Sequence, residues 1–152
     1  MLSPLELRQV RLEKLEIRVS STWGLKPLAD EMCRYNCYVE PAVRKRRGHW
    51  DFRVSLDVAF MPLEGETCRF DLIGVRLVGL FHLPDDTEES LVKTLVPLNC
   101  LAILYGIARG AVAQATGMVP GGPMILPPVN FVEVLKQRKR RKPKAITTNE
   151  PQ

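Results

Sequence analysis

A strict alternation of apolar and other residues predicts a β-strand over residues 52–60. The apolar members of the run are Phe52, Val54, Leu56, Val58 and Phe60, and polar or small residues stand between them. Successive side chains of a strand point to opposite faces of its sheet, so one face of this strand should be buried while the other meets water. A chain with such a strand must build a sheet that is covered on one face.

A first strand is predicted over residues 10–19, with an irregularity in its middle. Apolar residues alternate up to Leu12 and alternate again from Leu15, with one extra residue between the two sets. An extra residue in one strand of an antiparallel pair is a β-bulge. We therefore expect a bulge between Leu12 and Leu15.

Two more strands complete the predicted sheet. Residues 35–43 form a second strand, in which Pro41 favours an edge position because proline cannot donate a hydrogen bond to the ladder. Residues 68–83 form a fourth strand that is apolar on both faces. Only hairpin-length connections separate the second, third and fourth strands, so the sheet should be antiparallel. A longer crossover loop at residues 21–33 joins the first strand to the second.

Helical signals begin at residue 86. Asp86 and Glu89 have the spacing of a capping box, and Pro97 should interrupt the helix that follows. A long helix is expected from about residue 98 to residue 118, and Asn130 should cap a last helix. These elements predict an α+β fold, a four-stranded antiparallel sheet followed by helices packed on one face.

The length of 152 residues fits one domain, and 45% hydrophobic content is enough for a core. We expect a single domain at residues 1–141 and a disordered polar tail at residues 142–152. Residues 136–144, KQRKRRKPK, hold seven of the 22 Lys and Arg residues, so the remainder has 15 basic against 17 acidic residues. A basic run without apolar periodicity is typical of a solvated helix end.

The long predicted helix carries small residues on one flank. Gly106, Gly110, Ala113 and Gly117 recur at spacings of four, three and four, although each glycine costs about 1 kcal/mol relative to alanine in a helix interior. Polar residues such as Gln114 argue against a membrane span. Small residues let another backbone approach closely, so we predict a homo-oligomer interface. Its residues are Gly106, Arg109, Gly110, Ala113 and Gly117.

Neither catalysis nor metal binding is predicted. The sequence has two histidines and no GxSxG, Walker or HExxH motif, so it offers no recognisable nucleophile with a base and oxyanion donor. Cys33 and Cys37 with His49 lack a fourth ligand and standard spacing. The four cysteines and an N-terminus without an apolar signal segment indicate free thiols in a reducing cytoplasm. We expect no catalytic residues, no metal and no cofactor.

The second half of the chain resembles the SecB family of bacterial protein-export chaperones. The resemblance is most specific in PPVNF at residues 127–131 and in the spacing of Leu104, Tyr105 and Arg109. GLFHL at residues 79–83 is similar to the end of the family's fourth strand, and RLEKLEIRV at residues 11–19 resembles its first. The resemblance implies a four-stranded antiparallel sheet carrying the long helix. It also implies a homotetramer, a dimer of dimers, with helices between two eight-stranded sheets.

The resemblance further implies an ATP-independent holdase that binds unfolded preproteins in apolar grooves before export. The expected groove residues lie in the crossover and interhelical loops: Trp23, Leu25, Met32, Met118, Val119, Met124 and Leu126. Glu16 fits an acidic position through which the family docks the translocation motor SecA, whereas Gly74 stands where the last strand would supply another such residue. The family's acidic tail is replaced by a basic one.

Two alternatives stay open at this point. A SecB-like chaperone dedicated to one client, such as the antitoxin of a toxin–antitoxin system, fits the same sequence features. The alternative of another class is a nucleic-acid or ribosome-associated protein that uses RKRRGH at residues 44–49 together with the basic tail. The basic segments lack the interleaved aromatic residues on which bases stack, so nucleic acid is the less favoured partner.

Overall fold

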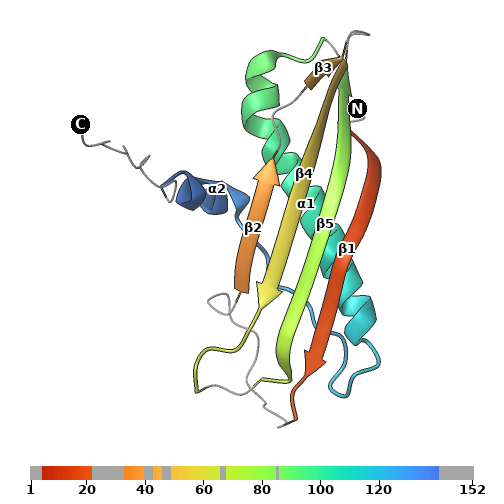
Figure 1. The fold of residues 1–152 in the computed structure, drawn as a ribbon, viewed down its shortest axis with the longest axis vertical. Helices are drawn as coiled ribbons and strands as arrows, with labels where there is room; N and C mark the ends of the chain where they lie inside the picture. The colour runs from red at the N-terminus through yellow and green to blue at the C-terminus, as the bar shows by residue number, and fades with distance from the viewer. Residues whose placement is uncertain are drawn as a thin grey trace, which may run out of the picture.

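The computed structural model of the chain describes residues 5–21, 33–39, 43–45, 49–65, 68–84 and 86–140. Five strands precede two helices (Figure 1). The elements are β1 (Glu6–Val19), β2 (Cys33–Val39), β3 (Val43–Lys45), β4 (His49–Phe60), β5 (Phe70–Pro84), α1 (Glu89–Thr116) and α2 (Phe131–Arg140).

The strands form one sheet in the order β1-β5-β4-β2. β2 pairs with residues 54–60 of β4, and β3 pairs with residues 49–51 of the same strand. Every pairing is antiparallel, so the predicted α+β architecture is confirmed. The strand count differs from the prediction, because residues 33–45 form two strands where one was expected. The break falls at residues 40–42, which lie outside the described residues and include Pro41.

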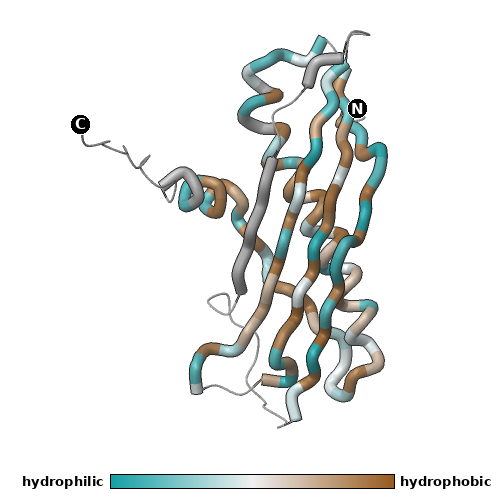
Figure 2. The backbone as a smooth tube through the Cα atoms, in the orientation of Figure 1, coloured by the Kyte–Doolittle hydropathy of each residue, from teal (hydrophilic) through white to brown (hydrophobic). Residues whose placement is uncertain are grey.

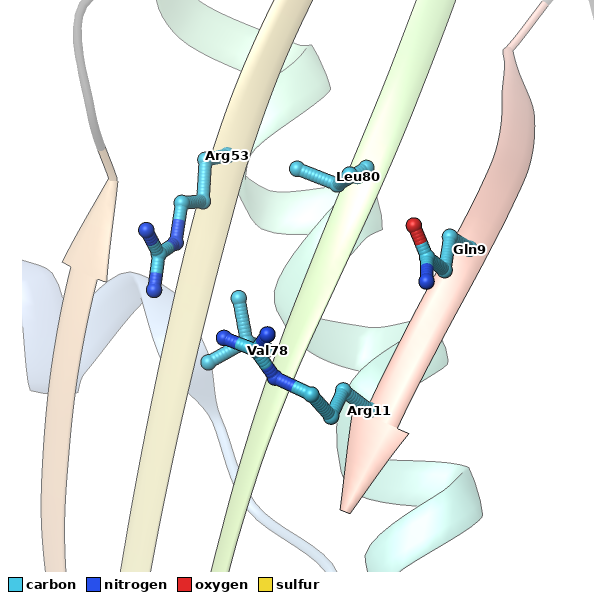
Figure 3. Close-up of a pocket in the computed structure, with 5 residues that line it drawn as sticks. All are labelled: Gln9, Arg11, Arg53, Val78 and Leu80. Atoms are coloured by element: carbon cyan, nitrogen blue, oxygen red, sulfur yellow. The ribbon is translucent and has the colours of Figure 1, made fainter. Parts of the chain in front are cut away.

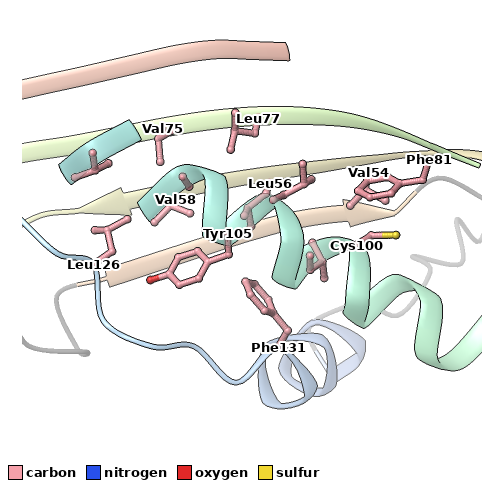
Figure 4. Close-up of a cluster of buried hydrophobic side chains, with 14 of the residues drawn as sticks. Val54, Leu56, Val58, Val75, Leu77, Phe81, Cys100, Tyr105, Leu126 and Phe131 are labelled. Atoms are coloured by element: carbon pink, nitrogen blue, oxygen red, sulfur yellow. The ribbon is translucent and has the colours of Figure 1, made fainter. Parts of the chain in front are cut away.

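The alternation that predicted a strand at residues 52–60 is confirmed in β4. Its apolar side chains are buried on the face of the sheet that carries α1, which we call the inner face, and the residues between them lie on the outer face. Leu56 pairs with Leu77 of β5 in the ladder, and both side chains are buried. Figure 4 shows side chains of these two strands meeting the helix side chains in the core.

The predicted bulge in β1 is confirmed. The pairing of β1 with β5 shifts register between Leu12 and Lys14, where the sequence has its extra residue. Two further shifts, between Leu7 and Gln9 and between Arg18 and Val19, had no clear sequence signal. The shift at Leu12 keeps the apolar residues of β1 on the inner face along the whole strand.

Helix α1 begins later than expected and continues through Pro97. Its N-cap is Glu88 and makes no side-chain capping bond, so the predicted capping box at Asp86 and Glu89 was wrong. Pro97 was expected to interrupt the helix, yet the helix runs on to Thr116. An internal proline costs about 3 kcal/mol. Burial of Val96 and Cys100 on either side of Pro97 offsets this cost.

One face of α1 packs on β4 and β5. The side chains that it buries are Leu101, Leu104, Ala108 and Val112. After α1 the chain doubles back along the helix, and α2 packs against α1 (Figure 1). The predicted cap of this last helix is confirmed, since the backbone N–H of Val132 donates to Oδ1 of Asn130 at 3.1 Å.

Candidate functional site

The segment between the two helices, residues 117–130, is fastened to α1 by two side chains of that helix. The Tyr105 hydroxyl donates to the carbonyl oxygen of Pro127, and Nε of Arg109 donates to that of Leu126 at 2.9 Å. The Tyr105 ring also meets the Phe131 ring edge-on at 5.5 Å (Figure 4). Motif residues that suggested the family therefore contact one another, and through them α1 binds the residues that lead into α2.

Arg109 was predicted to lie in an oligomer interface. Its bond to the Leu126 carbonyl gives it a role within the chain, since an irregular segment needs partners for its backbone carbonyls. The side chain is half-buried. Its contribution to a contact between copies stays a prediction.

Thr116 fastens the segment at its start. Its buried hydroxyl donates to the Val112 carbonyl at 2.7 Å and accepts from the backbone N–H of Met124 at 2.7 Å. One hydroxyl thus satisfies the last turn of α1 and ties residue 124 back to the helix.

Arg69, just before β5, holds the turn in the same segment. Its guanidinium donates to the carbonyls of Gly121 at 3.1 Å and Gly122 at 2.5 Å. Both glycines have positive φ, at 96° and 83°, and a Cβ on Gly121 would lie 3.0 Å from Cζ of Arg69. Glycine at residue 121 therefore permits both the backbone conformation and the approach of the arginine.

The fixed backbone of the segment leaves several apolar side chains in solvent. Met118 is 96% exposed and Ile125 is 55% exposed, while Val119 and Met124 are half-buried. Leu126, which was predicted to line a client groove, is 0% exposed and belongs to the core. Sequence reasoning missed Ile125, although in the extended run 124–126 neighbouring side chains point in opposite directions. The predicted groove residues Trp23, Leu25 and Met32 lie outside the described residues.

The small residues predicted to form an interface lie on the flank of α1 away from the sheet. Gly106 and Gly110 are exposed, and a Cβ built on either would have no described atom within 4 Å. Ala113 is half-buried and Gly117 is exposed. The flank also carries Ile103, a large apolar side chain that is exposed. Within the described residues, nothing packs closely against the two glycines.

The inner face of β1 is apolar as well, and the core covers only part of it, since Leu7 and Ile17 are half-buried against it. The helix packs mainly on β5 and β4, and Figure 1 shows it crossing behind these strands at an angle. The exposed apolar residues of β1 are Val10, Leu12, Leu15 and Val19. We call this set the β1 strip. Together with the glycine flank of α1, it forms a broad apolar surface that the described residues do not cover.

Glu16 lies on the outer face of β1 among cations. Its carboxylate accepts from Arg18 at 2.7 and 2.9 Å and lies 3.5 Å from Nζ of Lys14. The hydrogen bond from Arg18 holds the pKa of Glu16 below its usual range. Gly74 stands opposite Glu16 in the ladder, and a Cβ there would lie 3.7 Å from Cε of Lys14. This surface therefore pairs one carboxylate with two cations.

A shallow cavity of about 130 Å³ lies further along the outer face, lined by Gln9, Arg11, Arg53, Val78 and Leu80. Figure 3 shows the Arg11 side chain reaching from β1 across Val78. This explains why Val78 is only 5% exposed on a face that meets water, whereas Leu80 is 41% exposed. Sequence analysis did not bring these residues together, because the cavity combines side chains from three strands.

Two further features are the buried thiol of Cys100 and the apolar stretch of α1. Burial raises the pKa of Cys100 to about 12, so this thiol stays protonated and is not a nucleophile at neutral pH. Residues Val96–Thr116 of α1 are long and apolar enough to cross a membrane. In this structure one face of that stretch packs on the sheet.

Comparison with known proteins identifies relatives of one kind. No protein-family model matches the chain. The chain is 28% identical over 123 residues to the protein-export protein SecB of Parvibaculum lavamentivorans, covering 81% of this chain and 71% of that protein. It is 34% identical over 95 residues to SecB of Acidithiobacillus ferrooxidans, covering 62% of each. Across the matched SecB proteins the alignments span between 43% and 71% of the relative.

Comparison with solved structures finds the same fold in one of them. A protein of unknown function from Streptococcus agalactiae superposes with a TM-score of 0.60 at 12% identity, covering 82% of this chain and 97% of that one. The SecB-like chaperone of Mycobacterium tuberculosis, solved with a peptide from an antitoxin, gives a TM-score of 0.46 at 14% identity over 83% of this chain and 91% of that one. The sequence matches agree with the resemblance carried by the motifs at residues 104–109 and 127–131, and by sequence the chain is similar to SecB proteins.

Proposed function

We propose that this protein is an ATP-independent holdase that binds unfolded preproteins and keeps them from aggregating before export. The observation that carries the proposal is the segment at residues 117–130. Its backbone is fixed by Tyr105, Arg109, Thr116 and Arg69, yet it presents Met118 and Ile125 to solvent.

Such a segment suits clients of varied sequence. A fixed backbone loses little conformational entropy when a client binds, so less of the binding free energy is spent on ordering it. Met118 is unbranched and can adapt to differently shaped apolar side chains. Each Å² of apolar surface buried against the client contributes about 25 cal/mol before the ordering costs are subtracted. Folded proteins expose too few apolar segments to gain this.

The proposed groove consists of Trp23, Leu25, Met32, Met118, Val119 and Met124, to which the exposure of Ile125 adds a member. Leu126 is assigned to the core instead. Neither catalysis nor a cofactor is part of the proposed function, because the client is held by apolar burial.

The proposed assembly is a homotetramer built as a dimer of dimers. Two apolar surfaces without cover support it, the β1 strip and the flank of α1 that carries Gly106 and Gly110. The glycines leave room for a second backbone, and large exposed apolar patches are typical of contacts between proteins.

SecA is the proposed export partner in the cytoplasm, with Glu16 as the docking residue. Two cations already neutralise the Glu16 carboxylate, and Gly74 supplies no second acid. Docking at this surface should therefore depend on Arg18 and Lys14 as well as on Glu16, and salt should weaken it because these charges are exposed.

An aggregation assay without ATP tests the holdase proposal. The protein should suppress light scattering by a chemically denatured substrate and should not bind the same substrate when it is folded. The double variant Met118→Ser with Ile125→Ser should weaken suppression, while the oligomeric state stays unchanged. The control is Leu80→Ser, which removes an exposed apolar side chain from the outer face.

Two outcomes would overturn the proposal. The first is equal suppression by the groove variant and the wild type together with a normal result for the control. The second is tight binding of RNA or DNA that unfolded protein does not compete away, which would favour the nucleic-acid alternative.

A further inference from the structure

The chain has two histidines, 33 positions apart in the sequence, and the fold brings them together. His49 and Asp51 lie on the same face of β4 because they are two residues apart in a strand. His82 lies on β5, directly opposite Asp51 in the antiparallel ladder. All three side chains therefore stand on the outer face of the sheet, at the end of β4 that also pairs with β3.

The three side chains are close enough to share one ion. Nδ1 of His82 lies 3.0 Å from Oδ1 of Asp51, and Nε2 of His49 lies 3.6 Å from Oδ2 of the same carboxylate. The two imidazole rings are 4.5 Å apart between centroids. One ligand atom from each residue lies within 4.8 Å of the other two.

We propose that His49, Asp51 and His82 form a binding site for a late first-row divalent cation, with Zn²⁺ as the representative ion. Imidazole and carboxylate are ligands that Zn²⁺ accepts at about 2.0–2.2 Å, and tetrahedral ligands at that radius stand about 3.3 Å from one another. The distance between His82 and Asp51 is already close to this spacing. Nε2 of His49, 3.6 Å from the same carboxylate, would have to move slightly closer on binding.

The surroundings favour a three-residue site with an open position. The side chains of His49, Asp51 and His82 are 28%, 40% and 21% exposed, so a cation reaches them from solvent and a water molecule completes the tetrahedron. Glu6 stands opposite His82 on β1, but its carboxylate lies 3.0 Å from Arg8 and has its own cation.

A bound cation would change this part of the sheet. It would replace the hydrogen bond between His82 and Asp51, and the longer contact of His49 with Asp51, by bonds from one ion to both β4 and β5. The site lies on the outer face, whereas the segment at residues 117–130 follows the helix that covers the inner face. The proposal is therefore independent of the holdase proposal.

The chain has only two histidines, so each can be followed separately by NMR. Zn²⁺ is titrated into the chelator-treated full-length protein, and the ring resonances of both histidines are followed by NMR. We expect the two sets of resonances to shift together and to saturate at one equivalent per chain. Movement of only one histidine, or of neither, would overturn the site.

A variant series assigns the ligands. By calorimetry, His82→Gln should weaken Zn²⁺ binding by more than about tenfold, since even changes outside the ligand set typically cost 10- to 100-fold. Asp57→Asn is the matched control, because Asp57 is a paired carboxylate on the same face of β4. Equal loss in the control variant would contradict the assignment. If His82→Gln does not fold, the NMR titration of the wild type decides.

Cobalt separates this site from the cysteines. Co²⁺ bound by thiolates gives an intense charge-transfer absorption that imidazole and carboxylate ligands do not give. We expect the Co²⁺-loaded protein to lack this absorption and its histidine resonances to broaden. A thiolate spectrum would place the bound ion at cysteines and overturn the proposal.

Discussion

Strands β4 and β1 carry the same kind of pattern and meet opposite environments. Both alternate apolar residues on the inner face with other residues on the outer face, and Figure 2 shows hydrophobic and hydrophilic residues following one another along the strands. Leu56 of β4 is 1% exposed, whereas Leu12 of β1 is 48% exposed. The alternation determines which face of a strand is apolar, but the position of α1 decides which apolar face is covered. The exposed apolar residues of β1 are therefore where the proposed partner copy would pack.

Truncating one leucine in each strand should give the largest difference. Leu56→Ala leaves a cavity in a packed core and should lower the free energy of unfolding by about 2–5 kcal/mol. Leu12→Ala should cost far less in the single chain and should instead weaken the assembly. Urea denaturation measures the first effect, and light scattering over a dilution series measures the second. Equal destabilisation by the two variants would show that β1 is covered within the chain.

Two glycines sharpen the same contrast. A Cβ on Gly79 of β5 would lie 2.7 Å from the Phe81 ring and 2.9 Å from Leu104. Gly79→Ala should therefore destabilise the fold by about 1–3 kcal/mol through overpacking. A Cβ on Gly110 meets none of the described atoms within 4 Å, so Gly110→Leu should leave the midpoint of monomer unfolding nearly unchanged and disrupt the proposed tetramer. A wild type that is monomeric at micromolar concentration would refute the proposed assembly.

Removing one hydroxyl tests the attachment of the segment at residues 117–130. Tyr105→Phe keeps the ring contact with Phe131 but leaves the Pro127 carbonyl without its donor. The expected loss is about 0.5–1.5 kcal/mol in the free energy of unfolding. Hydrogen exchange of the backbone N–H of Met124 should report whether the segment loosens. Unchanged exchange and unchanged stability would mean that Arg109 and Thr116 suffice.

The smallest expected effect is a pH effect at Glu16. Its pKa is lowered chiefly by the hydrogen bond from Arg18, so the ion pair contributes its full stabilisation above the usual range of a glutamate. That contribution is lost as the pH falls through the lowered pKa of the folded state. Arg18→Gln should move the NMR-measured pKa of Glu16 back toward 4.5. No upward movement would assign the shift to another group.

Local patterns in the sequence predicted much of the fold. The alternation in β4, the bulge after Leu12 and the cap at Asn130 each depend on a few neighbouring residues, and all three are confirmed. Pro97 misled the helix prediction because its cost is local, while the burial that offsets it comes from strands far away in the sequence.

The candidate sites were less predictable, because their residues meet only after folding. No local pattern predicted that Arg109 donates to a carbonyl 17 residues away. Leu126 and Ile125 are both apolar, and only the folded structure shows that the first is buried and the second exposed. His82 reaches Asp51 through the register of β5 on β4. If the register of β5 on β4 had been known, the sequence would have predicted the contact between His82 and Asp51, since His49 and Asp51 already have the spacing of one strand face.

The pairing of β1 with β5 has a consequence for synthesis of the chain. β1 is synthesised before its partner strand β5, which spans Phe70–Pro84. Val19 can pair with Phe70 only after residues 20–70 have been made. At about 5–20 residues per second, the ribosome needs about 3–10 s to make the intervening chain. During that interval β1 is an extended segment with apolar side chains and an unpaired backbone. For those seconds the newborn protein presents the same kind of surface as the clients proposed for it.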